Sequence, residues 1–231
     1  MSDQDIRTEM LEAAKMHVPF DGWSDAALAA AARDAGVDIA LARAVFPRGG
    51  VDLALAYHEA GDRAMLDRLE AEADTLAAMR FRDRIAAAVR FRIEAIDDRE
   101  LARRGATLFA LPQHAPDGAR AIWRTCDRIW TALGDTADDV NWYTKRATLS
   151  GVYSSTLLYW LGDNSPEYAA TWDFLDRRIE DVMQFEKVKA QVRDNRVLGG
   201  LLAGPMAVLG KIRPPRRGVA DMPGRHGGDH H

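Results

Sequence analysis

Several features that would mark a protein class are rare or missing in this chain of 231 residues. It holds one cysteine, Cys126, which excludes a disulfide within the chain. Cys126 lies on an apolar stripe of residues at helical spacing, and this position predicts a core side chain rather than a reactive thiol. No run of about 18 apolar residues is present, so no transmembrane helix is expected. The first residues have neither a basic nor an apolar region, so no targeting peptide is expected.

The motifs of common enzyme classes are also missing. The sequence contains no glycine-rich nucleotide motif, no GxSxG and no HExxH. A di-iron bundle needs Glu-x-x-His pairs, and His17, His58 and His114 lie scattered outside any such pair. We therefore predict a protein that is not an enzyme and that holds no metal or cofactor.

The charge pattern argues against a nucleic-acid partner. The formal net charge is -4. Residues 24–57 have the proportions of a helix–turn–helix and resemble the N-terminal part of TetR-type regulators, yet they carry three arginines against four aspartates. DNA binding depends on Lys and Arg that neutralise phosphates, so we expect no nucleic-acid binding. A TetR-type transcriptional regulator that binds a hydrophobic ligand remains the alternative function.

Apolar residues recur at helical spacing along the chain, which predicts an all-α fold. A turn is expected at 17–23, with caps at Ser24 and Asp117. The expected helices are 4–16, 25–35, a short one ending at 46, 51–80, 81–96, 101–111 and 117–133. The arginines within 80–92 make that stretch basic, and we expect ordinary surface pairs with Asp83 and Glu94.

A helical hairpin is predicted between residues 138 and 183. One apolar stripe consists of Leu149, Tyr153, Thr156 and Trp160, and the other of Trp172, Leu175, Ile179 and Val182. Gly162 is expected to leave the first helix in a left-handed conformation. Ser165 is the expected cap of the second helix, with Pro166 at its first position.

The same region carries a family resemblance. The runs NWYTKR (141–146) and SPEYAATWDFLDRRIEDVM (165–183), together with HVPFDGW (17–23) and LFALPQHAP (108–116), resemble the COQ9 family of ubiquinone-biosynthesis accessory proteins. The resemblance covers about residues 4–212 and implies a TetR-like helical bundle. It divides the chain into a helix–turn–helix-like module without DNA-binding charge (1–50), a lipid-binding body (51–190), an amphipathic membrane-contacting helix (191–213) and a disordered tail (214–231).

The apolar stripes offer two readings, a filled core or a cavity for an isoprenoid lipid. The resemblance favours the cavity, with an isoprenoid quinone or a phospholipid as ligand. The predicted lipid-binding residues are Trp123, Trp130, Leu149, Tyr153, Leu157, Trp160, Trp172, Leu175 and Ile179.

The resemblance also implies a protein partner, a Coq7-like hydroxylase. The predicted partner-binding residues are Asn141, Trp142, Tyr143 and Arg146. Helical periodicity alone would bury Trp142, whereas a cap at Asn141 would expose both rings in a first turn. A homodimer is expected from the resemblance to TetR-like proteins.

Residues 197–210 form a stretch of 14 residues without a charge, bounded by basic residues. Such a stretch suits a helix in the membrane interface, or one that folds back over the body. The predicted membrane-contacting residues are Leu198, Leu201, Leu202, Met206, Leu209, Lys211 and Arg213. We therefore expect a cytoplasmic protein, peripheral on an inner membrane, that presents polyprenyl quinone intermediates to the hydroxylase.

Overall fold

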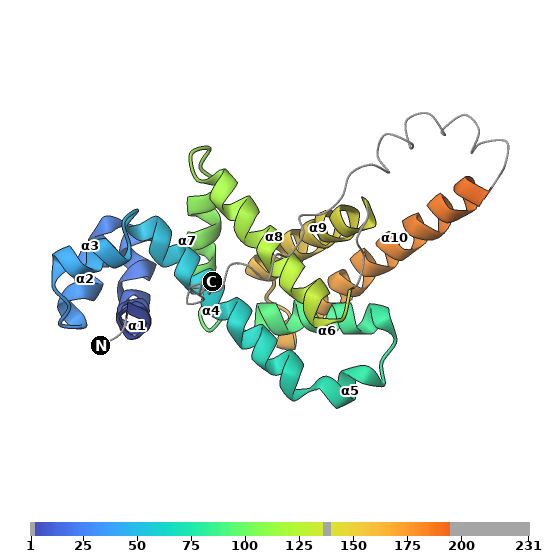
Figure 1. The fold of residues 1–231 in the computed structure, drawn as a ribbon, viewed down its shortest axis with the longest axis horizontal. Helices are drawn as coiled ribbons and strands as arrows, with labels where there is room; N and C mark the ends of the chain where they lie inside the picture. Colours follow the sequence, from blue (N-terminus) through green and yellow to red (C-terminus); the bar gives the residue numbers. More distant parts are fainter. Residues whose placement is uncertain (1–2, 136–139, 195–231) are drawn as a thin grey trace, which may run out of the picture.

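The computed structural model describes residues 3–135 and 140–194, and every regular element in these ranges is helical. This confirms the predicted all-α fold. Figure 1 shows α1 to α3 gathered at one end, with α4 leading from them toward α5 and α6. The elements are α1 (Asp3–Asp21), α2 (Asp25–Asp34), α3 (Ile39–Val45), α4 (Gly50–Ala71), α5 (Ala73–Ala77), α6 (Phe81–Glu94), α7 (Arg99–Ala110), α8 (Ala115–Ala132), α9 (Val140–Gly162), the 3₁₀ turn η1 (Pro166–Tyr168) and α10 (Ala169–Asp194).

Side chains cap the second and third helices. Ser24 Oγ accepts a hydrogen bond of 3.2 Å from the Ala27 amide, which confirms the predicted cap of α2. Asp38 Oδ1 accepts one of 2.8 Å from the Ala40 amide at the start of α3. Between these helices Gly36 has a φ of +64°, a left-handed angle that glycine adopts at little cost. Local chemistry therefore fixes the helix–turn–helix-like geometry.

The turn predicted at 17–23 is wrong for most of its length, because α1 continues through Pro19 to Asp21. Pro19 lies in the last turn, where it removes one intrahelical hydrogen bond and leaves the preceding turns intact. Gly22, with a φ of +66°, ends the helix and donates its amide to the Val18 carbonyl.

The described residues form two hydrophobic cores, and α4 contributes to both. Leu53 and Ala54 pack with α1 to α3 in the first core, and Leu101 of α7 joins them. Met65 and Leu69 pack in the second core, with α5, α6, α8, α9 and α10. Because one helix serves both cores, a boundary at residue 50 marks the start of α4 rather than a gap between independent units.

Two further predicted helix limits are wrong. The helix expected over 51–80 breaks at Glu72, so that α4 ends at Ala71 and a short α5 follows. The helix expected to start after Asp117 begins at Ala115, with Pro116 in its first turn. Asp117 instead binds Arg48 of the α3–α4 turn and Arg120 of its own helix.

The predicted hairpin is present as α9 and α10. Leu149, Tyr153, Thr156 and Trp160 are all buried, which confirms the inward stripe of α9. The prediction for Gly162 is wrong, because it remains the last residue of α9 and the left-handed angles fall on Glu167 (φ 51°) and Tyr168 (φ 55°).

Asp163 organises the turn that joins the two helices. Its carboxylate accepts hydrogen bonds from the Ser165 amide (2.8 Å), the Thr171 amide (2.9 Å) and the Thr171 hydroxyl (2.6 Å). Pro166 therefore opens a 3₁₀ turn, and α10 starts three residues later, at Ala169. The predicted cap, Ser165, accepts a hydrogen bond from the Ala170 amide.

We predict that Asp163→Asn destabilises the hairpin in a pH-dependent way. The hydrogen bonds from Thr171 and Ser165 lower the pKa of Asp163 from 3.8 to about 2. A lowered carboxyl pKa stabilises the fold above the unfolded-state value, and this stabilisation is lost as the pH falls from about 4 to 2. The difference in unfolding free energy between wild type and variant should therefore shrink over that range in denaturant titrations. The exposed Asp173→Asn is the control, and a pH-independent difference would contradict the prediction.

Candidate functional site

Three aromatic rings from α8 and α9 form a cluster. The centroid of the Trp123 ring lies 6.0 Å from that of Trp142 and 6.4 Å from that of Tyr143. The Trp142 and Tyr143 rings meet edge to face, with centroids 4.8 Å apart. All three side chains are half-buried. We call Trp123, Trp142 and Tyr143 the aromatic cluster.

Arg146 packs against the aromatic cluster through a cation–π contact with Trp142. Its guanidinium carbon lies 4.0 Å from the centroid of the Trp142 ring, and the side chain is 1% exposed. Asp127 of α8 (2.7 Å) and Asp135 of the following loop (3.0 Å) accept hydrogen bonds from this guanidinium. Arg146 is therefore enclosed and positions Trp142 in this structure, and its predicted contact with a partner stays a prediction.

The start of α9 decides the exposure of the cluster. The helix begins at Val140, so Asn141 is a helical residue and not its cap. Trp142 and Tyr143 lie in its first turn, and both side chains are half-buried. Half-burial of Trp142 replaces both sequence-based expectations, complete burial and full exposure.

Most of the predicted lipid-binding residues lie together in the second core. Trp123 is the exception, since it belongs to the aromatic cluster. Leu157 and Trp172 are half-buried at the edge of this core. The buried members are Trp130, Leu149, Tyr153, Trp160, Leu175 and Ile179. The structure therefore brings this set together across α8, α9 and α10, and its ligand role stays a prediction.

A pocket of about 240 Å³ lies between the start of α6 and α10. Only Ile179 of the predicted lipid-binding set lines it. Its other lining residues are Arg80, Arg82, Asp83, Ala86, Asp176 and Glu180. Because most of these side chains are charged, this pocket does not suit an isoprenoid chain.

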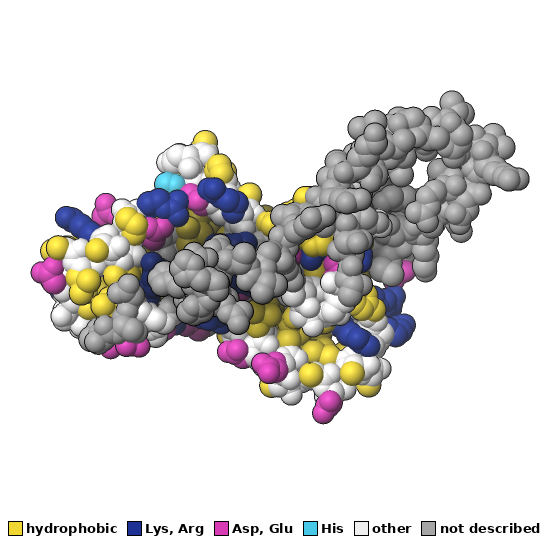
Figure 2. Space-filling model, in the orientation of Figure 1, with side chains coloured by type: hydrophobic (Ala, Val, Ile, Leu, Met, Phe, Trp, Pro, Cys, Tyr) yellow, Lys and Arg dark blue, Asp and Glu magenta, His cyan; other side chains and the backbone are white. Residues whose placement is uncertain are grey.

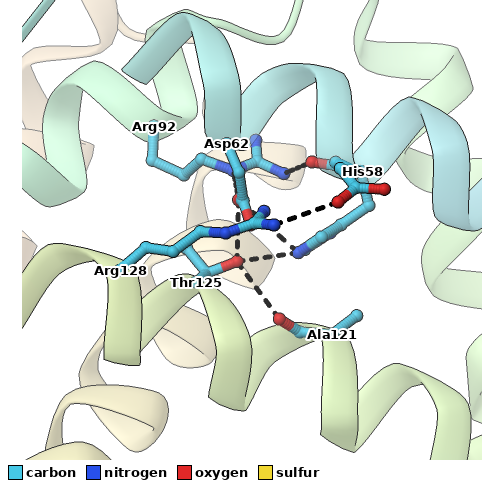
Figure 3. A network of polar contacts seen from close by, with 7 residues as sticks. His58, Asp62, Arg92, Ala121, Thr125 and Arg128 are labelled. Atoms are coloured by element: carbon cyan, nitrogen blue, oxygen red, sulfur yellow. Dashed lines mark hydrogen bonds and ion pairs between the residues drawn. The ribbon is translucent and has the colours of Figure 1, made fainter. Parts of the chain in front are cut away.

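A buried polar network joins α4, α6 and α8, and no sequence motif predicted it. Asp62 accepts hydrogen bonds of 2.7 Å from both Arg92 and Arg128, and one of 2.8 Å from the Thr125 hydroxyl. His58 Nε2 lies 2.8 Å from that hydroxyl (Figure 3). Burial alone would raise the pKa of Asp62, but Arg92 and these hydrogen bonds keep it below its ordinary value. We call these five residues the Asp62 network.

The expectation of ordinary surface pairs for the basic stretch 80–92 is partly wrong. Arg80 binds Asp83 and Arg90 binds Glu94 at the surface, as expected. Arg92, however, is 3% exposed and pairs with Asp62. One sequence feature could have indicated a buried polar partner for Arg92. His58 and Asp62 are four residues apart, on the apolar side of α4.

Residues 3–135 and 140–194, the ranges that the structure describes, include the chain's one thiol, that of Cys126. Burial raises the pKa of the Cys126 thiol to about 12, so it stays protonated at neutral pH, as expected of a core residue. These ranges hold no cluster of three or more His, Cys, Asp or Glu side chains suited to a metal ion. Among the same residues, no helix is long and apolar enough to cross a membrane.

Comparison with known proteins identifies the family. A family model described as COQ9 matches residues 115–186, which include the aromatic cluster. The ubiquinone biosynthesis protein COQ9-A, mitochondrial, of Xenopus laevis is 30% identical over 218 residues, which are 90% of this chain and 68% of that protein. This chain belongs to the COQ9 family. The human COQ9 protein is 29% identical over 201 residues, which are 83% of this chain and 62% of the relative.

The fold of this COQ9 family member is TetR-like, as predicted. A TetR transcriptional regulator from Nitrosomonas europaea ATCC 19718 superposes with a TM-score of 0.60 and covers 76% of this chain and 97% of the regulator. Sequence identity is 20%, so the similarity concerns the fold alone.

We predict that His58 makes this protein acid-sensitive. Burial, aided by the charge of Arg92, lowers the pKa of His58 from 6.5 to about 4, although Asp62 and the Ala121 carbonyl oppose this shift and Arg124 adds to it. Below pH 6.5 the unfolded chain binds a proton that the folded chain excludes until about pH 4. The free energy of unfolding should therefore fall by up to about 1.4 kcal/mol per pH unit over this range.

Urea titrations of wild type and His58→Gln between pH 7 and 4 test this. The loop substitution His114→Gln serves as control and should keep the wild-type slope. Equal slopes for wild type and His58→Gln would contradict the assignment.

Proposed function

We propose that this protein is a non-enzymatic, lipid-binding accessory protein of ubiquinone biosynthesis. It would take polyprenyl quinone intermediates from the membrane and present them to a Coq7-like hydroxylase. The observation that carries the proposal is that the COQ9 family match spans both the aromatic cluster and the helices of the predicted lipid-binding set.

The aromatic cluster suits a protein contact. Trp and Tyr are the residues most often found as energetic anchors of interfaces, since they bury a large area at low entropic cost. The base of the cluster is rigid, because Arg146 is hydrogen-bonded to two carboxylates and to the Trp142 carbonyl (3.1 Å). Asn141 is exposed beside the rings and supplies a polar rim. An anchor that is ordered before binding loses little entropy when a partner arrives.

The second core supports the lipid half of the proposal. Its buried side chains are apolar or aromatic and come from α4, α5, α6, α8, α9 and α10. An isoprenoid chain needs such surroundings, and neither an acid–base pair nor a metal. The phenol of Tyr153 remains protonated there, because burial raises its pKa to about 12.

The predicted membrane contact falls on residues 191–213, of which 195–213 lie outside the described residues. The sequence pattern is therefore the support for this membrane contact and for the proposed peripheral location at an inner membrane. The expected homodimer also remains part of the proposal.

The alternative function, a TetR-type regulator, has the fold in its favour. Its third helix presents Ile39, Ala40 and Leu41 as exposed residues, together with the single cation Arg43. These side chains offer little to phosphates or base edges. The accessory function is therefore the better supported of the two.

We predict that Trp142→Ala weakens binding of the hydroxylase of the same organism about 30-fold, the loss expected of a hot-spot residue. Helix content should not change, because Trp142 is half-buried in the first turn of α9. Calorimetric titration measures the affinity and circular dichroism the helicity. Tyr159→Ala, an exposed ring on the same helix, is the control and should bind normally. Unchanged affinity for Trp142→Ala would refute the partner surface.

A further inference from the structure

The outer face of α1 carries two large apolar side chains without any packing role. Phe20 is 85% exposed and Met16 is 73% exposed. On the opposite face of the same helix Met10, Ala14 and Val18 are fully buried. Glu9, Glu12, Met16 and Phe20 follow one another at spacings of three and four residues, so they share one face. With Asp21, which follows Phe20, we call this set the α1 ridge.

In the segment HVPFDGW (17–23), several neighbours of Phe20 make contacts with the rest of the fold, whereas Phe20 itself is exposed. Val18 is buried, and Trp23 is buried with its indole nitrogen donating to the Leu101 carbonyl at 3.1 Å. The Pro19 carbonyl accepts a hydrogen bond of 2.7 Å from Arg104 of α7. His17 lies 2.7 Å from Asp34 of α2. Each of these contacts fixes the end of α1, and none involves the Phe20 ring.

These contacts also make the ridge rigid. Arg104 and Trp23 tie the end of α1 to α7, and Lys15 binds Asp97 at 2.7 Å in the α6–α7 turn. Met16 and Phe20 therefore project from a fixed helix rather than from a mobile end. Two apolar side chains one turn apart on a fixed helix are the typical anchors of a helix that binds in a groove.

The charges around the ridge are acidic. Figure 2 shows hydrophobic and acidic side chains together on the end of the molecule that α1 to α3 form. Glu9 and Asp21 are exposed, and the Glu12 side chain is 62% exposed. Of the two cations of α1, Arg7 donates to the Val45 carbonyl at 2.8 Å, and Lys15 is shared between Asp97 and Glu12 of the ridge. The ridge therefore keeps a net negative charge, with three carboxylates against one shared lysine. Such a face repels nucleic acid and anionic lipid headgroups, and it attracts a surface with Lys and Arg.

We propose that the α1 ridge is a docking site for a second protein, one with an apolar groove bordered by Lys and Arg. Phe20 and Met16 fill the groove, and Glu9, Glu12 and Asp21 pair with its basic border. This gives the N-terminal module a role in protein binding, and it does not depend on the proposed quinone function or on the aromatic cluster.

The test uses the full chain in its own cells, with the photoreactive residue p-benzoylphenylalanine in place of Phe20. The matched control carries it in place of Met79, a residue with 37% exposure in the turn before α6. We expect an adduct with another protein from position 20 and not from position 79. Mass spectrometry should place the attachment among apolar residues bordered by Lys or Arg.

The purified partner then provides the decisive measurement. Phe20→Ser and the double substitution Glu9→Lys, Glu12→Lys should each weaken binding at least about tenfold, and added salt should weaken it in wild type. The thermal unfolding midpoint should change little, because these side chains are exposed and the ion pair that is lost, Glu12–Lys15, lies at the surface. The proposal is overturned by no adduct specific to position 20, by adducts only with lipid or with a second copy of the chain, or by binding that ignores charge reversal.

Discussion

The carboxylate of Asp62 is the shared acceptor on which the arrangement of α4, α6 and α8 depends. A buried charge is costly unless it is paired and fully hydrogen-bonded, and Asp62 meets this condition through Arg92, Arg128 and Thr125. Removal of one partner of such a group typically costs about 3–5 kcal/mol, because the remaining charges stay buried. Gly61 is part of this geometry, since a Cβ atom there would come within 2.6 Å of the Arg92 guanidinium.

The helix α8 connects this network to the candidate site. Thr125 and Arg128 of α8 bind Asp62, while Asp127 of the same helix holds Arg146 beneath Trp142. Cys126 and Ile129 contribute to the second core. One helix therefore contributes to the Asp62 network, to the second core and to the support of the aromatic cluster. The position of the cluster depends on contacts that lie on the far side of α8.

The sequence predicted those features that depend on local pattern. The inward stripe of α9 and the cap at Ser24 follow from side-chain spacing and from short-range hydrogen bonding, both of which can be read along the chain. The turn between α9 and α10 could not be predicted, because it depends on hydrogen bonds between Asp163 and Thr171, which lie eight residues apart. Arg92 was assigned to the surface, since its nearest acids in the sequence are surface partners and its actual partner lies 30 residues away. The burial of Arg146 depends on Asp127 and Asp135, which only the packing of α8 against α9 brings close.

The proposed function assigns the aromatic cluster to a protein partner and the second core to a quinone or phospholipid, and membership of the COQ9 family supports it. Its central claim is that the protein carries a lipid, and the lipid content of the protein tests this most directly. The chain should be purified from its own cells without detergent, extracted with organic solvent and measured by quantitative mass spectrometry. The account predicts a polyprenyl quinone intermediate or a phospholipid in near-stoichiometric amount. An extract no richer in lipid than that of an unrelated helical protein, purified in the same way, would contradict it.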